Sequence, residues 1–237
     1  MKRLQSYLAQ AVCAVAFVTL AFSFAAAAET VEVVPGVQVT KRNYTAPVNE
    51  QPFFGFAAKT AEQKAEDEKF VAAIISASGT REKAFEEITK RAWIAIQGGK
   101  VREAAVRFNQ AFLVSPDESS IFHGFAVIAQ ARFNDLEGAE ELFKIALKQP
   151  HPVKALKADY GRLLLIAKRP RDAQEVLDQA VKETPDLSDA WTNLAWARFQ
   201  NGDPAAACAA AEEAARKRPS NNSISDLTAV RNFAQCK

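Results

Sequence analysis

The side chains that most often carry out chemistry at neutral pH are scarce in this 237-residue sequence, which has two histidines, His123 and His151. Histidine is the usual general acid or base in enzymes, because its ordinary pKa is about 6.5. His123 falls in a stretch with helical spacing, where a histidine that faces a groove or bonds to a neighbour is commoner than a catalytic base. The sequence has no His-Glu-x-x-His metal motif, no Gly-x-Ser-x-Gly nucleophile motif and no phosphate-binding glycine loop. We therefore expect no catalytic residues, no metal site and no cofactor.

The first 28 residues have the composition of an export signal. Lys2 and Arg3 form a basic start, residues 9–27 are almost entirely apolar, and small residues stand at 25–28, where a signal peptidase would cut. We expect a signal peptide at 1–28 and a periplasmic location for the remaining chain. An uncleaved N-terminal anchor is the alternative, because the apolar stretch approaches the length that crosses a bilayer.

Cysteine usage points to structure rather than catalysis. Cys13 lies in the leader, which leaves Cys208 and Cys236 in what we expect to be an oxidising compartment. No histidine lies near either thiol in the sequence, so neither is expected to act as a nucleophile. Cys208 falls in an expected helix at 204–217 and Cys236 at the end of the last one. Two alternatives stay open for them: a disulfide, or two separate thiols.

The overall charge gives no reason to expect nucleic-acid or membrane binding. Of the 30 lysines and arginines two lie in the leader, so that 28 basic residues face 28 acidic ones in the rest of the chain. A protein without net charge has no long-range field that attracts nucleic acid or anionic lipid. Basic clusters remain at 168–171 and 216–218, and we interpret both as helix-end cations in solvent or beside the helix dipole.

The strongest pattern in the chain is a unit of about 34 residues that recurs between Phe85 and Pro219. Each copy has an alanine, an apolar or small residue four positions later, a second alanine three positions after that, and then a proline. The first alanines are spaced by 35, 34 and 34 residues: Ala104, Ala139, Ala173 and Ala207. A period of this size indicates a repeat array, and stacked helix pairs present an extended surface to other molecules.

Turn residues and apolar spacing divide the rest of the chain. Residues 29–60 carry prolines, asparagines and Gly55 with little helical period, which predicts an extended segment, whereas 61–84 predicts a leading helix and the entry to the first repeat. The repeats occupy 85–219, and an apolar stripe near the C-terminus predicts a capping helix within 220–237. We expect no sheet beyond the N-terminal segment, because every later apolar stripe has helical spacing.

The last unit resembles the tetratricopeptide repeat through Trp191, Leu194, Ala195, Gly202, Ala207, Ala211, Ala214 and Pro219. The other three units match fewer positions; Lys168, for example, stands where the third unit would have a turn glycine. The resemblance implies an all-α, right-handed superhelical solenoid of about four helix pairs. It also implies a binding protein rather than an enzyme.

In tetratricopeptide proteins the first helix of each pair lines the concave face, and the resemblance assigns a set of side chains to that face. Amides among them can bond to an extended peptide backbone, Arg162 can hold a carboxylate, and tryptophans supply large contact areas. Packing between repeats is the alternative for both Trp93 and Trp196. The expected partner-binding residues are Thr89, Trp93, Gln97, His123, Gln130, Arg162, Asp189, Thr192, Trp196 and Gln200.

Three phenylalanines, Phe53, Phe54 and Phe56, lie close together at 49–56, which we call the aromatic segment. Burying one phenylalanine side chain is worth roughly 1.5 to 3 kcal/mol, so these rings are expected to dock. They can pack on the chain's own first helices. Alternatively, the segment acts as a strap that inserts into the chain's own groove or into another molecule.

We therefore expect an adaptor or scaffold that binds other envelope proteins or extended peptides, with no nucleic-acid partner and no membrane span once the leader is cleaved. The second hypothesis is a soluble carrier or chaperone for apolar ligands or envelope proteins, which an exposed apolar cavity would favour. A cell-wall hydrolase is a third, but it would need a convergent acid and base that the sequence does not show.

Overall fold

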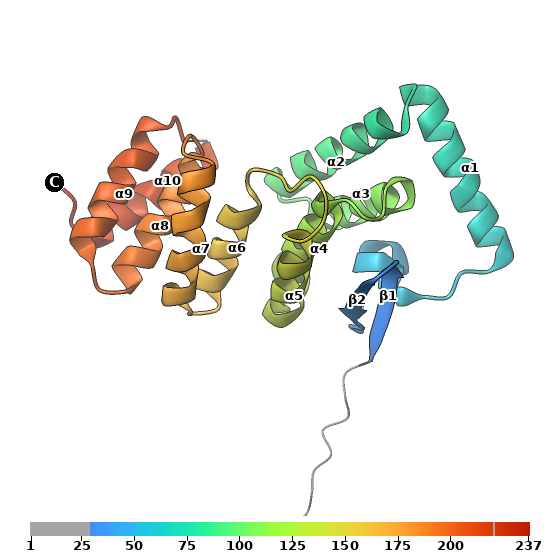
Figure 1. The fold of residues 1–237 in the computed structure, drawn as a ribbon, viewed down its shortest axis with the longest axis horizontal. Coiled ribbons are helices and arrows are strands. Elements are labelled where there is room, and N and C mark those ends of the chain that lie inside the picture. Colours follow the sequence, from blue (N-terminus) through green and yellow to red (C-terminus); the bar gives the residue numbers. More distant parts are fainter. Residues whose placement is uncertain (1–28, 220) are drawn as a thin grey trace, which may run out of the picture.

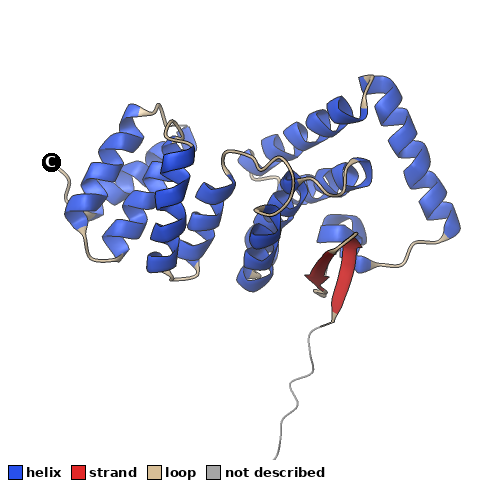
Figure 2. Ribbon diagram, viewed as in Figure 1, coloured by secondary structure: helices blue, strands red, loops and turns tan. Residues whose placement is uncertain are grey.

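The computed structural model describes residues 29–219 and 221–237, and it is helical apart from a short hairpin at its start (Figures 1 and 2). The expected signal peptide lies outside these residues. The elements are β1 Thr30–Val34, β2 Val37–Thr40, the 3₁₀ turns η1 Val48–Glu50 and η2 Pro52–Phe56, α1 Ala61–Ser78, α2 Arg81–Gln97, α3 Val101–Val114, α4 Ser119–Phe133, α5 Leu136–Ala146, α6 Leu156–Ile166, α7 Pro170–Glu183, α8 Ser188–Gln200, α9 Pro204–Arg216 and α10 Asn221–Phe233.

Four helix pairs, α2/α3, α4/α5, α6/α7 and α8/α9, follow one another along the molecule, with α1 at one end and α10 beside α8 and α9 at the other (Figure 1). The predicted all-α repeat fold is therefore confirmed. None of the described helices is long and apolar enough to cross a membrane.

The repeating alanines hold the helices of each pair close together. Both alanines of every unit are buried. Glycine serves the same purpose at two helix crossings: a Cβ on Gly161 would lie 2.4 Å from Leu177 Cγ, and one on Gly124 would lie 2.3 Å from Phe108 Cε1. Small residues at these contacts let neighbouring backbones approach, which explains why the unit repeats as it does.

Turns between the helices use left-handed backbone conformations. Gly99 and Gly202 have φ of 70° and 85°, and at the corresponding turns Asn134 and Lys168 have φ of 51° and 58°. A non-glycine residue in this region is strained, and asparagine tolerates it better than lysine. Lys168 therefore occupies a turn position for which glycine is the better residue.

The N-terminal segment is more ordered than the sequence predicted. β1 and β2 pair as an antiparallel hairpin, with Val31 opposite Val39, and the chain then forms η1 and η2 before α1 begins. Thr60 caps α1 through a capping box with Gln63. Strand β2 contacts α5, and the turns η1 and η2 contact α3, so the N-terminal segment packs on these helices.

Candidate partner-binding surface

A groove in the C-terminal half of the array contains three of the predicted partner-binding residues. It is a hollow of about 270 Å³ between α6, α8 and α10, which we call the C-terminal groove. Its lining combines apolar, amide and charged side chains: Arg162, Leu165, Ile166, Asn193, Trp196, Gln200 and Asp226. The structure therefore brings Arg162, Trp196 and Gln200 together, and their role in binding stays a prediction.

The capping helix α10 forms one wall of this groove. Arg162 Nη1 donates to Asp226 Oδ2 at 2.6 Å. Farther along α10, the ring of Phe233 lies 5.8 Å from that of Trp196 and 6.1 Å from that of Phe199, and Phe233 is 64% exposed. The far end of α10 is joined to α9 by a disulfide between Cys208 and Cys236, whose Cα atoms are 5.3 Å apart. The groove is thus complete only while α10 stays in place.

Sequence reasoning missed Asp226, which lines the groove, and the contact of Phe233 with the groove residue Trp196. The apolar stripe of α10 was expected to cover the last repeat, and Leu227 and Val230 are indeed buried. Ile224 and Phe233 of the same stripe are exposed. The helical spacing of the stripe identified the helix, but only its placement beside α6 and α8 shows which side chains line the groove.

Two predicted residues of α8 lie beside the capping helix rather than facing a partner. Thr192 is 2% exposed and its hydroxyl donates to the Ser188 carbonyl oxygen at 3.1 Å. It is not available for binding, which corrects the prediction for this residue. Asp189 is exposed, but its carboxylate accepts a hydrogen bond from the Ser223 hydroxyl of α10. Asp189 thus helps to position α10.

The N-terminal half of the array offers less of a groove than predicted. His123 is 1% exposed, its Nε2 lies 2.8 Å from Asp159 Oδ2, and its ring lies between those of Trp93 and Phe143. The prediction that His123 contacts a partner is therefore wrong, because burial between two rings removes it from the surface.

Trp93 is half-buried and packs edge-on against Phe108, with 5.2 Å between the ring centroids. That contact lies within one helix pair, but the Trp93 ring also lies 4.6 Å from the His123 ring of the next pair, which corresponds to the alternative of packing between repeats. Thr89 is also buried and donates to the Phe85 carbonyl oxygen at 2.8 Å, so it cannot meet a partner. Gln97 is exposed and Gln130 half-buried, and both stay candidates.

The aromatic segment docks on the chain's own helices, as the first of the two alternatives stated. The Phe53 ring is buried, and three rings of α3 and α4 lie within 6 Å of it, those of Phe112, Phe122 and Phe125. The segment contacts α3 and α4 and does not lie in the C-terminal groove, so the strap hypothesis is wrong for the chain's own groove. Phe53, Phe54 and Phe56 all have positive φ, between 52° and 57°, a strained conformation that the surrounding contacts must hold.

Asn109 of α3 supplies the polar part of that docking. It is 1% exposed, its Nδ2 donates to the carbonyl oxygens of Asn49 and Gln51 at 3.0 and 2.7 Å, and its Oδ1 accepts from the Phe54 N–H at 3.0 Å. One side chain therefore satisfies three backbone groups of a turn that would otherwise be costly to bury.

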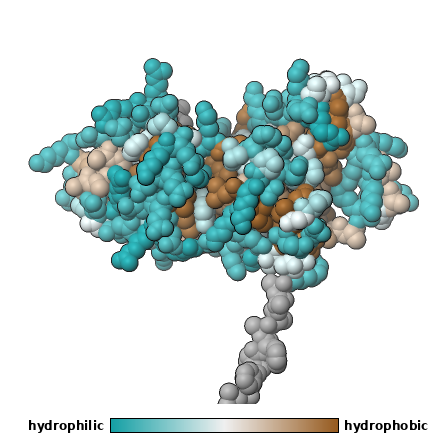
Figure 3. Space-filling view, viewed as in Figure 1, coloured by the Kyte–Doolittle hydropathy of each residue, from teal (hydrophilic) through white to brown (hydrophobic). Residues whose placement is uncertain are grey.

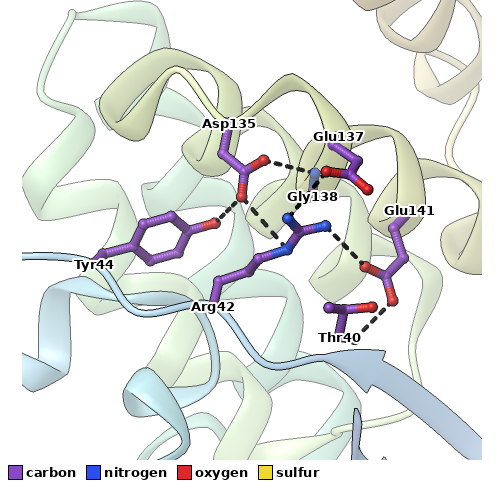
Figure 4. A network of polar contacts seen from close by, with 7 residues as sticks. All are labelled: Thr40, Arg42, Tyr44, Asp135, Glu137, Gly138 and Glu141. Atoms are coloured by element: carbon purple, nitrogen blue, oxygen red, sulfur yellow. Dashed lines mark hydrogen bonds and ion pairs between the residues drawn. The ribbon is translucent and has the colours of Figure 1, made fainter. Parts of the chain in front are cut away.

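A second polar network fastens the hairpin to α5 (Figure 4). Asp135 caps α5 by accepting from the Gly138 N–H, and it also accepts from the Tyr44 hydroxyl at 2.7 Å. Arg42 lies 3.7 Å from Asp135 and 3.6 Å from Glu141. Burial and the bond to Asp135 raise the pKa of Tyr44, so its hydroxyl stays a donor over the physiological range. This cluster fastens the N-terminal segment to α5 rather than forming a catalytic site, because the carboxylates of Asp135 and Glu141 are already paired with Arg42.

The described residues give little support to a metal site or to nucleophilic chemistry. Within residues 29–219 and 221–237, no group of three or more His, Cys, Asp or Glu side chains is arranged to hold a metal ion. His151 is exposed and its Nδ1 lies 3.2 Å from Glu118 Oε2. The Cys208 and Cys236 sulfurs, joined in a disulfide, are not nucleophiles.

Comparisons with known proteins agree with the architecture. The family model of the tetratricopeptide repeat matches residues 159–222. No curated protein matches the sequence significantly. Among solved structures, Pseudomonas aeruginosa PilF is similar with a TM-score of 0.54 and 22% identity, over 65% of this chain and 71% of that chain.

Two further structures share the fold. A thermophilic tetratricopeptide-repeat protein of Thermus thermophilus has a TM-score of 0.51 and 16% identity, over 69% of this chain and 98% of that chain. PilW, a widely conserved type IV pilus biogenesis factor, has a TM-score of 0.50 and 16% identity, over 75% of this chain and 89% of that chain. At these identities the structures show the fold alone. With the family match to residues 159–222 and the four helix pairs, they show that this chain has the tetratricopeptide-repeat fold.

Proposed function

We propose that this protein is a non-enzymatic periplasmic adaptor, which binds extended segments of other envelope proteins in its C-terminal groove. The observation that carries the proposal is the lining of that groove. The half-buried Trp196 and the exposed Gln200 lie one helical turn apart on α8, opposite Arg162 of α6. An aromatic face, an amide and a cation are the groups that recognise an extended peptide by apolar contact and by hydrogen bonds to its backbone.

The size of the groove supports a peptide rather than a bulky apolar ligand. At about 270 Å³ it lies just below the range typical of small-molecule pockets, and it is open on one side to charged residues. Tetratricopeptide-repeat proteins are generally non-enzymatic scaffolds. An adaptor role therefore needs no feature of this chain beyond the binding surface that its helix pairs offer.

An exposed apolar cavity would favour the carrier hypothesis, and the aromatic segment is one place where such a cavity could lie. The cavity beside Pro52, Phe53 and Phe56 measures only about 10 Å³, little more than the space of one water molecule. Phe53 itself is buried among rings of the same chain. The aromatic residues that motivated a carrier therefore stabilise the fold, and the adaptor is the better supported function.

The periplasmic part of the proposal is supported by the sequence of residues 1–28 and by the disulfide. The leader has the basic start, apolar stretch and small residues of an export signal. A disulfide between Cys208 and Cys236 would persist in an oxidising compartment and would be reduced in a bacterial cytoplasm.

Site-specific photo-crosslinking in cells tests the function. A benzoylphenylalanine placed at Gln200, in the groove, is compared with one at Glu175, an exposed residue of α7. We expect the same crosslinked envelope protein from Gln200 in repeated experiments, none from Glu175, and loss of the crosslink when Trp196→Ala is added. Crosslinks of equal yield at both positions, or a Gln200 crosslink that survives Trp196→Ala, would place the partner elsewhere and refute the proposal.

A further inference from the structure

A second hollow adjoins the C-terminal groove and differs from it in charge. It measures about 390 Å³ and lies between the α6–α7 turn, the start of α7 and the end of α8. We call it the cationic hollow; its lining is Lys168, Arg169, Pro170, Arg171, Asp172, Gln200 and Asn201. Gln200 lines both hollows, so the two adjoin at this residue, and we refer to them together as the depression.

Only part of the positive charge in the cationic hollow is balanced. Arg169 is paired twice, with Nε 2.6 Å from Asp172 Oδ2 and Nη1 2.6 Å from Glu140 Oε2. Lys168 and Arg171 are exposed and have no acidic partner among the described residues. Two cations are therefore available to a ligand.

The adjoining groove supplies an apolar site at a short distance. Ile166 is 42% exposed, and with Leu165 and Trp196 it forms the apolar part of the groove. An exposed isoleucine beside a half-buried tryptophan is the sort of surface that a partner's apolar side chain covers.

From this juxtaposition we infer that the depression recognises an acidic peptide motif: an extended segment with a large apolar side chain in the C-terminal groove and aspartate or glutamate at Lys168 and Arg171. The inference rests on the proposed function and names the partner's chemistry. Trp196 and Gln200 are about 6 Å apart along the helix axis, and an extended chain advances about 3.3 Å per residue. An extended chain therefore covers the distance from Trp196 to Gln200, where the cationic hollow begins, in about two residues, so the acidic side chain stands at least about two residues from the apolar one.

A peptide fits these charges better than a nucleic acid. Nucleic-acid affinity grows with the number of phosphates neutralised, and the depression offers two unpaired cations with Asp172 and Asp226 at its edges. An apolar hollow beside the cations has no counterpart in a phosphate backbone. One or two acidic residues beside an apolar side chain match the charge of the cationic hollow and the apolar lining of the C-terminal groove.

Selection from a random peptide library tests the inference on the protein expressed from its full sequence and purified. We expect the parent to enrich peptides that combine a large apolar residue with an acidic residue at least about two positions away. The variant Lys168→Glu/Arg171→Glu should keep the apolar preference and reverse the charge preference. The matched control Lys64→Glu/Lys69→Glu makes the same change in net charge at exposed sites of α1 and should select as the parent does.

The variant Lys168→Gly/Arg171→Gln gives a quantitative test that loss of fold cannot explain, because glycine relieves the positive φ at position 168. We expect it to bind the best selected peptide about tenfold more weakly than the parent at low salt, with a smaller difference at high salt. Equal affinity of this variant and the parent would overturn the inference, as would selected peptides without acidic residues.

The outcomes separate this inference from the proposed function. Apolar peptides without acidic bias, lost with Trp196→Ala, would support the adaptor groove and refute the acidic motif. No enrichment that depends on Trp196 would refute both. Tight binding of a single-stranded DNA oligonucleotide that depends on Lys168 and Arg171 would also refute the acidic-peptide motif.

Discussion

The disulfide between Cys208 and Cys236 should decide whether the capping helix stays in place. It closes a loop of 28 residues, and in the chain-entropy account a crosslink over such a loop stabilises the folded state by about 3.5 kcal/mol. In a repeat array each unit is stabilised only by its neighbours, so the loss should fall on the last pair and on α10. The double variant Cys208→Ser/Cys236→Ser and the reduced parent should therefore lose α10 before the rest unfolds.

Hydrogen exchange measures this loss locally. Without the crosslink, the amides of α10 should exchange up to about 300-fold faster, which corresponds to the same 3.5 kcal/mol, whereas those of α4 should not change. The groove should open at the same time, because Asp226 and Phe233 leave Arg162 and Trp196. Peptide binding and α10 protection are thus expected to fall together.

The double serine variant is the control, because a reducing agent should change exchange in the parent and leave the variant unaffected. Acceleration of less than about fivefold at α10 in the reduced parent would refute the reasoning, since it would mean that burial of Leu227 and Val230 alone holds the helix. Titration that finds two reactive thiols in the native protein would refute it more directly, by showing that the bond does not form.

Three further predictions concern the fold around the site. Gly161→Ala should destabilise the protein by about 1 to 3 kcal/mol, although alanine is the better helix former, because the new Cβ meets Leu177; a urea midpoint equal to the parent's would contradict this. Asn109→Ala should cost about 2 to 3 kcal/mol and make residues 41–60 the first site of limited proteolysis, since two carbonyl groups and one N–H lose their partner; cleavage elsewhere first would contradict it. Desolvation raises the pKa of Glu140, but hydrogen bonds from Lys144 and Arg169 outweigh this effect, so the pKa lies below its ordinary value. The contribution of this carboxylate to stability is therefore fully present above the ordinary pKa and is lost as the pH falls through the depressed pKa. The difference in unfolding free energy between the parent and Glu140→Gln should therefore shrink between pH 6 and pH 3, and a difference that grows toward pH 3 would show the sign to be wrong.

The helix pairs could be predicted from sequence because their determinants are local. Alanine at a fixed spacing allows close approach of two helices, and that spacing is visible without knowledge of any other part of the chain. The hairpin and the polar contacts that fasten the N-terminal segment to the helices could not be predicted in this way. Arg42 meets Asp135, and Asn49 meets Asn109, across long stretches of sequence, and no periodicity records such a pairing.

The candidate site was predictable only in part, for a related reason. Thr192 and Trp196 are four residues apart and share one face of α8, so a helical pattern assigns both to the same surface. Thr192 is buried and bonds to the Ser188 carbonyl oxygen, whereas Trp196 lies at the groove beside Phe233 of α10, a helix that also contacts Asp189 and Phe199. Which residues on this face of α8 remain available to a partner thus depends in part on α10, a helix that belongs to no repeat.

The two halves of the array have different physical characters, and this limits where a partner can bind. In the N-terminal half, His123, Trp93 and Phe143 pack together where a groove would begin, and the hairpin and aromatic segment brace α3, α4 and α5 from their other side. Large hydrophobic residues are exposed in both halves, Ile94 of α2 among them, but Ile166 of the C-terminal half lines a groove that adjoins Lys168 and Arg171. On the face shown in Figure 3, hydrophobic side chains gather toward the middle of the molecule while much of the remaining surface is hydrophilic. The half that its own N-terminal segment contacts can serve as a support, whereas the half that leaves apolar surface beside unpaired cations is the one built to meet another chain.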